Sequence, residues 1–154
     1  MCADTIPEIS EFGSVDPAPP GKTMSIGEHR NFLNDESCRM FLRMRSLFAL
    51  RNIGGDEAVK ALCSGFSSAS ALLRHEIAYV LGQMQNNTAI PSLIDILSNA
   101  DEHVMVRHEA AEAMGAIGDQ VVRGTLEKFL NDENREVSES CEVALDLLDY
   151  HQSN

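Results

Sequence analysis

A twelve-residue phrase that occurs twice at a fixed spacing constrains the fold of this chain more than any other feature. RHEIAYVLGQMQ begins at Arg74, and RHEAAEAMGAIG begins 33 residues later at Arg107. Weaker copies begin at Arg43 and Ser138, 31 residues before the first phrase and 31 after the second. A fixed period of about 20–50 residues is typical of proteins built from stacked repeats. The sequence therefore predicts about three to four copies of one structural unit.

Each predicted repeat has the pattern of two α-helices. An apolar stripe at helical spacing, including Leu73, Ile77 and Leu81, runs through the first phrase. A Gly- or Asn-bearing break follows each longer helix, and Asp56 and Asp119 suit the start of a second, shorter helix. Antiparallel helix pairs at this period describe an all-α fold, a HEAT-type α-solenoid.

The composition of the chain changes near residue 27. Four of the five prolines lie in residues 1–27, where apolar periodicity is weak, so we predict a flexible Pro- and Gly-containing linker or tail there. We assign residues 28–150 to a HEAT-like repeat domain that carries both phrases, and residues 151–154 to a C-terminal tail. No apolar run approaches the roughly 20 residues of a membrane span, so no membrane partner is expected.

The charge balance bears on the class of partner. The formal net charge is −12, which argues against nucleic acid, since phosphate binding depends on clustered Lys and Arg. A cationic partner fits better, and acidity that only confers solubility explains the charge about equally well. The four cysteines lack CxxC spacing, and Met1 is not followed by a basic and apolar signal segment. These features favour a reducing compartment, and we expect a cytoplasmic protein.

Each phrase sets an imidazole directly before a carboxylate, as His75-Glu76 and His108-Glu109. Equivalent helices of a solenoid run parallel about 8–10 Å apart, so the two imidazoles can converge on one ion. One such dipeptide is usually only a surface pair, whereas two copies in register favour a metal site with these four residues as ligands. Ligands without sulfur suit iron, manganese or zinc, and open coordination positions favour non-haem iron.

The helix faces that carry the histidines also carry residues suited to substrate contact. At about 100° per residue, His75 shares its face with Tyr79 and Gly82. The equivalent face of the second phrase carries Glu112 and Gly115. We predict that all four of these neighbours contact substrate, with Glu112 attracting a cationic group and the glycines leaving open space beside the histidines.

At these residues the chain resembles the deoxyhypusine hydroxylases, a family of HEAT-repeat di-iron monooxygenases. Beyond the two phrases, the resemblance includes LFALRNIGG from Leu47, VMV before Arg107, and ESCEVALDL from Glu139. It covers nearly everything from Ser14 to about Tyr150. The family consists of two pseudo-symmetric halves with two His-Glu motifs each, and this chain resembles the C-terminal half alone.

The resemblance implies hydroxylation of the deoxyhypusine side chain of translation initiation factor five A to hypusine. The cofactor would be a centre of two Fe(II) ions, with dioxygen as co-substrate. By position, His75, Glu76, His108 and Glu109 would supply ligands for one half of that centre, and Glu112 would hold the amines of the substrate. We therefore expect a half-length enzyme that is completed by a missing N-terminal half or by a second copy in a homodimer. The alternative is a catalytically incomplete HEAT-repeat scaffold that binds proteins, with or without a metal.

Overall fold

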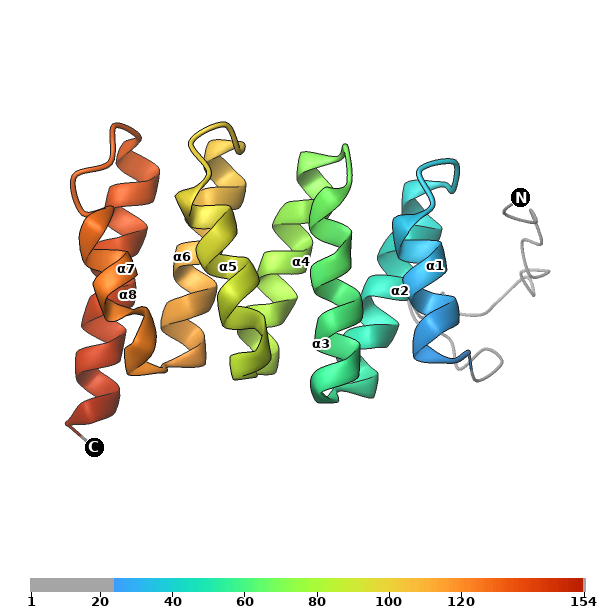
Figure 1. The fold of residues 1–154 in the computed structure, drawn as a ribbon, viewed down its shortest axis with the longest axis horizontal. Coiled ribbons are helices and arrows are strands. Elements are labelled where there is room, and N and C mark those ends of the chain that lie inside the picture. The colour runs from blue at the N-terminus through green and yellow to red at the C-terminus, as the bar shows by residue number, and fades with distance from the viewer. Residues whose placement is uncertain (1–23, 154) are drawn as a thin grey trace, which may run out of the picture.

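The structure, a computed structural model, describes residues 24–153 and arranges them as a row of helix pairs (Figure 1). Every regular element in this range is helical. The α-helices are α1 (Ile26–Asn34), α2 (Met40–Ile53), α3 (Gly55–Cys63), α4 (Ala71–Met84), α5 (Ile90–Ser98), α6 (Val104–Ile117), α7 (Arg123–Lys128) and α8 (Arg135–Gln152). Short 3-10 turns precede α4, α5 and α7: η1 (Ser64–Ser67), η2 (Asn87–Ala89) and η3 (Gln120–Val122). The predicted all-α solenoid is confirmed.

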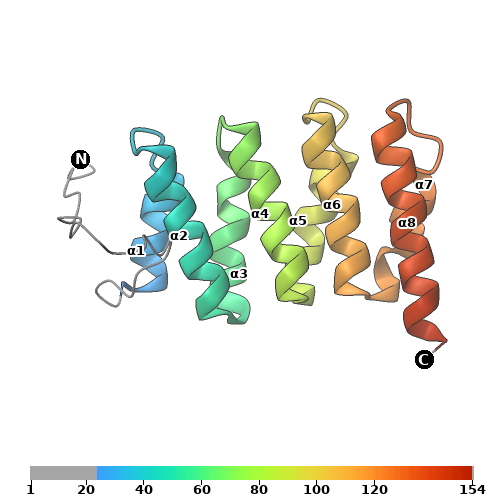
Figure 2. The same ribbon diagram turned by 180° about the vertical axis from the view of Figure 1, so that it is seen from behind.

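The helices form two layers. The shorter helices α1, α3, α5 and α7 face the viewer in Figure 1, and the longer helices α2, α4, α6 and α8 face the viewer in Figure 2. The most extensive packing joins α4 to α6 and α6 to α8 within the long-helix layer. The four helix pairs agree with the predicted three to four repeats.

The boundaries of the repeat domain differ from those predicted. Helix α1 begins at Ile26 because Ser25 caps it: its Oγ accepts from the Glu28 N–H at 3.1 Å, and the Glu28 carboxylate accepts from the Ser25 N–H at 2.7 Å. Helix α8 continues to Gln152, so His151 belongs to a helix and not to a tail. The rest of the predicted linker, residues 1–23, lies outside the described residues. Within those residues, no helix is long and apolar enough to cross a membrane.

Two glycines lie where the long helices approach most closely. A Cβ on Gly82 would lie 3.0 Å from Cα of Ala113, and a Cβ on Gly115 would lie 2.8 Å from Cα of Ala144. The prediction that these glycines leave open space beside the histidines is therefore wrong. The neighbouring helix fills that space, because only a glycine lets the two backbones come this close.

A buried arginine near the start of α6 ties three elements together. Arg107 is 3% exposed, and its Nε donates to the carbonyl of Leu97 in α5 at 3.0 Å. Its two terminal nitrogens donate to the carboxylate of Asp132, in the loop before α8, at 3.2 and 2.5 Å. The planar guanidinium thereby satisfies a helix-end carbonyl and a loop carboxylate at once.

Equivalent arginines repeat this arrangement along the solenoid. Arg74 in α4 donates to the Ser68 carbonyl at 2.7 Å and to both carboxylate oxygens of Glu102 at 2.8 and 2.6 Å. Arg43 in α2 donates to the Leu33 carbonyl at 2.9 Å and to the Glu36 carboxylate at 2.8 and 3.1 Å. The first residue of each Arg-bearing phrase is thus a structural connector between helices.

The close approach at Gly115 yields a stability prediction. Because its nearest neighbours would be main-chain Cα and Cβ atoms of Ala144, Gly115→Ala forces α6 and α8 apart and destabilises the protein by about 1–3 kcal/mol. Gly124→Ala is the matched control, since nothing lies within 4 Å of a Cβ there. Urea unfolding should show the control unchanged or slightly stabilised; equal midpoints for the two variants would contradict the packing role.

The buried arginine yields a second prediction. Arg107→Met leaves the Leu97 carbonyl and the Asp132 carboxylate without their donor, so the free energy of unfolding falls by about 3 kcal/mol near pH 7. The hydrogen bond from Arg107 lowers the pKa of Asp132 below 3.8, so this stabilisation is present above pH 3.8 and is lost as the pH falls below it. The free energies of unfolding of wild type and Arg107→Met should therefore approach each other as the pH falls below 3.8.

Arg135→Met serves as the control for that experiment. Its ion pair with Glu139, at 2.6 Å, is exposed on both sides, so its loss should leave the urea midpoint nearly unchanged. A comparable loss of stability in both variants would show that the burial of Arg107 is irrelevant.

Candidate metal centre

The two histidines lie on neighbouring helices of the long-helix layer. His75 lies near the start of α4, whose first turn is capped by the Ser70 hydroxyl, which accepts from the Leu73 N–H at 3.2 Å. His108 occupies the equivalent place in α6, whose first turn is capped by the His103 imidazole. The regular stacking of the two helices brings the two imidazoles toward one carboxylate.

That carboxylate belongs to Glu109. Its Oε2 lies 3.2 Å from Nε2 of His75 and 4.0 Å from Nε2 of His108. The His-Glu motif therefore acts across repeats: the glutamate of one repeat faces the histidine of the repeat before it. Both Nε2 atoms point toward the same oxygen, which is the geometry of a small site between α4 and α6.

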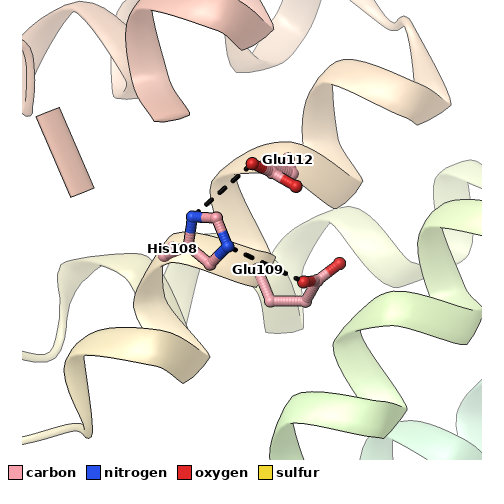
Figure 3. Close-up of side chains that lie close together, drawn as sticks. All are labelled: His108, Glu109 and Glu112. Carbon is pink, nitrogen blue, oxygen red and sulfur yellow. Dashed lines mark ion pairs between the residues drawn. The ribbon is translucent and has the colours of Figure 1, made fainter. Parts of the chain in front are cut away.

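The remaining glutamates flank the outer nitrogens of the two rings. Glu76 Oε1 lies 3.6 Å from Nδ1 of His75, and Glu112 Oε1 lies 3.5 Å from Nδ1 of His108. The ligand atoms of His108, Glu109 and Glu112 fall within 4.8 Å of one another. Figure 3 shows these three side chains and the ion pairs that join them. The structure thus brings together all four residues predicted as ligands, together with Glu112.

Burial gives Glu109 an unusual electrostatic environment. The residue is 8% exposed, and desolvation raises the pKa of its carboxyl group, against the opposing effect of His75. Within residues 24–153, its ion-pair partners are the two histidines, with no Lys or Arg among them. A bound cation would compensate the buried charge.

Two other shielded carboxylates show the contrast. Asp132 and Glu102 have side chains that are 10% and 6% exposed, and each is held by a guanidinium. The hydrogen bond from Arg107 lowers the pKa of Asp132. Burial would raise the pKa of Glu102, but hydrogen bonds from Arg74 and from the His103 N–H hold it below its usual value. Glu109 differs because its neutralising partner is not an arginine.

The structure adds one residue that the sequence did not single out. Ser140, in α8, is 4% exposed, and its Oγ lies 2.5 Å from Nδ1 of His108. It is 31 residues after Glu109 and therefore occupies the glutamate position of the fourth, degenerate phrase. The repeat register was the signal that could have found it.

A cavity of about 450 Å³ opens next to the carboxylates and is lined by α4, α6 and α8. Glu109 and Glu112 line it, and so do apolar side chains that include Val143 and Leu147. Tyr79 and Gly82, both predicted to contact substrate, border the cavity as well. Gly115 is not among its lining residues, because Ala144 packs against it.

The donor set suits a divalent cation. Two imidazole nitrogens face one carboxylate oxygen of Glu109, and of these three residues Glu109 also lines the cavity. A site with two histidines, one carboxylate and open positions is typical of non-haem iron in enzymes that use oxygen. The described residues around it offer no thiolate, since the free cysteines Cys63 and Cys141 lie elsewhere and burial raises the pKa of each.

Comparison with known proteins gives consistent matches. The family model described as HEAT repeats matches residues 30–104 and 59–146. A deoxyhypusine hydroxylase of Danio rerio is 52% identical over 143 residues, which cover 93% of this chain and 47% of the relative. The Homo sapiens deoxyhypusine hydroxylase is 48% identical, with 94% of this chain and 48% of the relative covered. The chain spans about half the length of the curated relatives it matches.

Solved structures agree with this result. The structure of human deoxyhypusine hydroxylase in complex with glycerol superposes with a TM-score of 0.83 at 48% identity, covering 94% of this chain and 50% of that one. A complex of CpcE and CpcF of phycocyanin lyase from Nostoc superposes with a TM-score of 0.65 at 23% identity, a likeness of fold alone. Both Arg-His-Glu phrases lie within the matched repeats, and the chain belongs to the HEAT-repeat family.

Proposed function

We propose that this chain supplies one half of the catalytic centre of a deoxyhypusine hydroxylase. The reaction is the iron- and dioxygen-dependent hydroxylation of the deoxyhypusine side chain of translation initiation factor five A, in the cytoplasm. The observation that carries the proposal is the convergence of two Nε2 atoms on a buried carboxylate that no Lys or Arg of residues 24–153 neutralises. The similarity to deoxyhypusine hydroxylases over about 94% of the chain supports it.

We assign His75, His108 and Glu109 as the residues that hold Fe(II). When bound, the iron supplies the activation of dioxygen. Glu76 lies on the outer side of the His75 ring, at Nδ1, so we assign it to orienting that ring and to a second iron of the complete centre. The protein keeps the ligands aligned because the Arg107 and Arg74 connectors fix α4 and α6.

The cavity beside the iron ligands suits the substrate side chain. Deoxyhypusine is an aminobutylated lysine, which combines a long aliphatic arm with amines. The apolar lining, including Val143 and Leu147, accommodates the arm, and Glu112 offers a partly exposed carboxylate to an ammonium group. Tyr79 and Gly82 border the same space. Glu112 therefore binds and positions the ammonium group of the substrate, and the buried Glu109 binds the metal.

We further propose that a second half completes the site, either another part of a longer protein or a second copy of this chain. Besides the buried Arg43, helix α2 contains Arg45 and Arg51 and no Asp or Glu, whereas α8 contains five Asp or Glu and one Arg. In a face-to-face dimer with its two-fold axis along the helices, α2 lies opposite α8 of the partner. The same operation places His75 opposite the second copy's His108. Charge complementarity and completion of the metal centre therefore favour the same dimer.

The metal assignment is tested by iron analysis and by the hydroxylation assay with deoxyhypusine-bearing protein substrate. Anaerobically loaded wild type should hold about one Fe(II) per chain and lose it in His75→Ala, His108→Ala and Glu109→Gln, with an unchanged helical circular-dichroism spectrum. His151→Ala, on the exposed last turn of α8, is the control and should keep its iron. Iron retained in all three site variants refutes the ligand set. Iron bound without hydroxylation by any assembled form leaves a metal-binding scaffold.

The assembly proposal predicts a salt-sensitive dimer. Light scattering should give twice the chain mass at low ionic strength and partial dissociation at about 0.5 M salt, where charges are screened within several ångströms. Arg45→Glu with Arg51→Glu should give monomers, and Glu139→Arg with Asp146→Arg added to them should restore the dimer. A wild-type monomer under all conditions rules out the second copy and leaves a separate half as the completing partner.

A further inference from the structure

We infer that Ser140 is a positioning residue that fixes the tautomer of His108 and so directs its Nε2 lone pair into the metal site. The inference rests on the proposed metal site but concerns a residue outside both His-Glu motifs. It follows from the hydrogen-bond chain formed by His108, Ser140 and Glu112, which joins α6 to α8.

The geometry of this chain is compact. Nδ1 of His108 lies 2.5 Å from Oγ of Ser140, and the same Oγ lies 3.5 Å from Oε1 of Glu112. Ser140 is 4% exposed, so water does not compete freely for its hydroxyl group. Glu112 Oε1 also lies 3.5 Å from Nδ1 itself. Within residues 24–153, the polar partners on this side of the ring are therefore a hydroxyl and a carboxylate.

The chemistry of these groups sets the direction of the bonds. An ionised carboxylate only accepts, so the Ser140 O–H donates to Glu112. The Ser140 oxygen must then accept from Nδ1–H of His108. The direct contact between Nδ1 and Glu112 demands the same proton position. Both contacts place a proton on Nδ1, so the neutral imidazole of His108 leaves Nε2 unprotonated.

That tautomer is the one a metal site at Glu109 requires. A metal-binding nitrogen must present a lone pair, and the hydrogen bond at the other nitrogen decides which one does so. Nε2 of His108 faces Glu109 Oε2 at 4.0 Å, a separation that leaves room for an ion to bridge the two atoms. With the opposite tautomer, an N–H would point at the ion.

The identity of the residue at this position matters. Glu109 Oε2 faces Nε2 of His75 in the preceding repeat, whereas Ser140 Oγ, at the equivalent position one repeat later, faces Nδ1 of His108. A third glutamate at position 140 would place another buried negative charge beside Glu112. The neutral hydroxyl group of Ser140 accepts from His108 and donates to Glu112 without adding a buried charge. Ser140 can therefore orient His108 although it is not a carboxylate.

The test uses the full chain in its metal-free form and Co²⁺ as the probe ion. Long-range ¹H–¹⁵N spectra of the imidazoles should show wild-type His108 as the Nδ1–H tautomer, and Ser140→Ala should shift it toward Nε2–H. Titration with Co²⁺ should show a roughly tenfold loss of affinity in Ser140→Ala. Ser140→Thr, which keeps the hydroxyl group, should restore most of the affinity.

Ser46→Ala is the matched control. Ser46 is also buried on a long helix, and its Oγ lies 3.4 Å from Nδ1 of His29, which is not part of the metal cluster. Loss of that contact should leave the His108 tautomer and Co²⁺ affinity unchanged. An Nε2–H tautomer in wild-type His108, or equal Co²⁺ affinity in wild type and Ser140→Ala, overturns the inference. If wild type binds no Co²⁺, the proposed metal site fails, and the tautomer spectra of wild type and Ser140→Ala still decide the role of Ser140.

Discussion

The structure depends on one repeated interaction. Near the start of each of several successive long helices, an arginine donates hydrogen bonds to a helix-end carbonyl and to a carboxylate in a loop. Arg107 joins the end of α5 to the loop before α8, and Arg74 joins the end of η1 to the loop before α6. A guanidinium is suited to this position because its planar donors satisfy a carbonyl and both oxygens of a carboxylate together. These connectors fix the rotation and the height of each long helix. The histidine that follows each of these two arginines therefore reaches the same depth in adjacent repeats.

The candidate metal centre lies where a buried carboxylate is not paired with an arginine. Asp132 and Glu102 are held by arginines, whereas Glu109 is buried against two imidazoles, and burial raises its pKa. A carboxylate in that environment is costly unless a cation joins it. The contact between Glu109 and His75 joins the motifs of two successive repeats. The deoxyhypusine hydroxylases to which this chain is similar are about twice as long as the chain.

The sequence predicted which polar side chains lie close together better than it predicted what surrounds them. The register of the two phrases was enough to predict that the imidazoles of His75 and His108 converge, since equivalent positions on stacked helices are neighbours. The same reasoning misjudged Gly82 and Gly115, because a glycine beside a histidine looks like open space until the next helix is placed against it. The predicted start of the repeat domain at residue 28 is also too late, because the cap formed by Ser25 and Glu28 spans residues that resemble a linker. Ser140 lies at the glutamate position of the fourth phrase, but only its contact with His108 in the structure reveals it.

The sequence by itself determined the all-α repeat architecture, the number of repeats and the two His-Glu pairs, because periodic apolar spacing and a repeated phrase are properties of the chain order. Only the tertiary structure decided which nitrogen faces which oxygen. It placed both Nε2 atoms at Glu109, set Ser140 behind His108, and closed the space beside the glycines. The physical reason is that these contacts join different helices, and their distances depend on how closely the backbones approach and on the direction in which each buried polar group finds its partner.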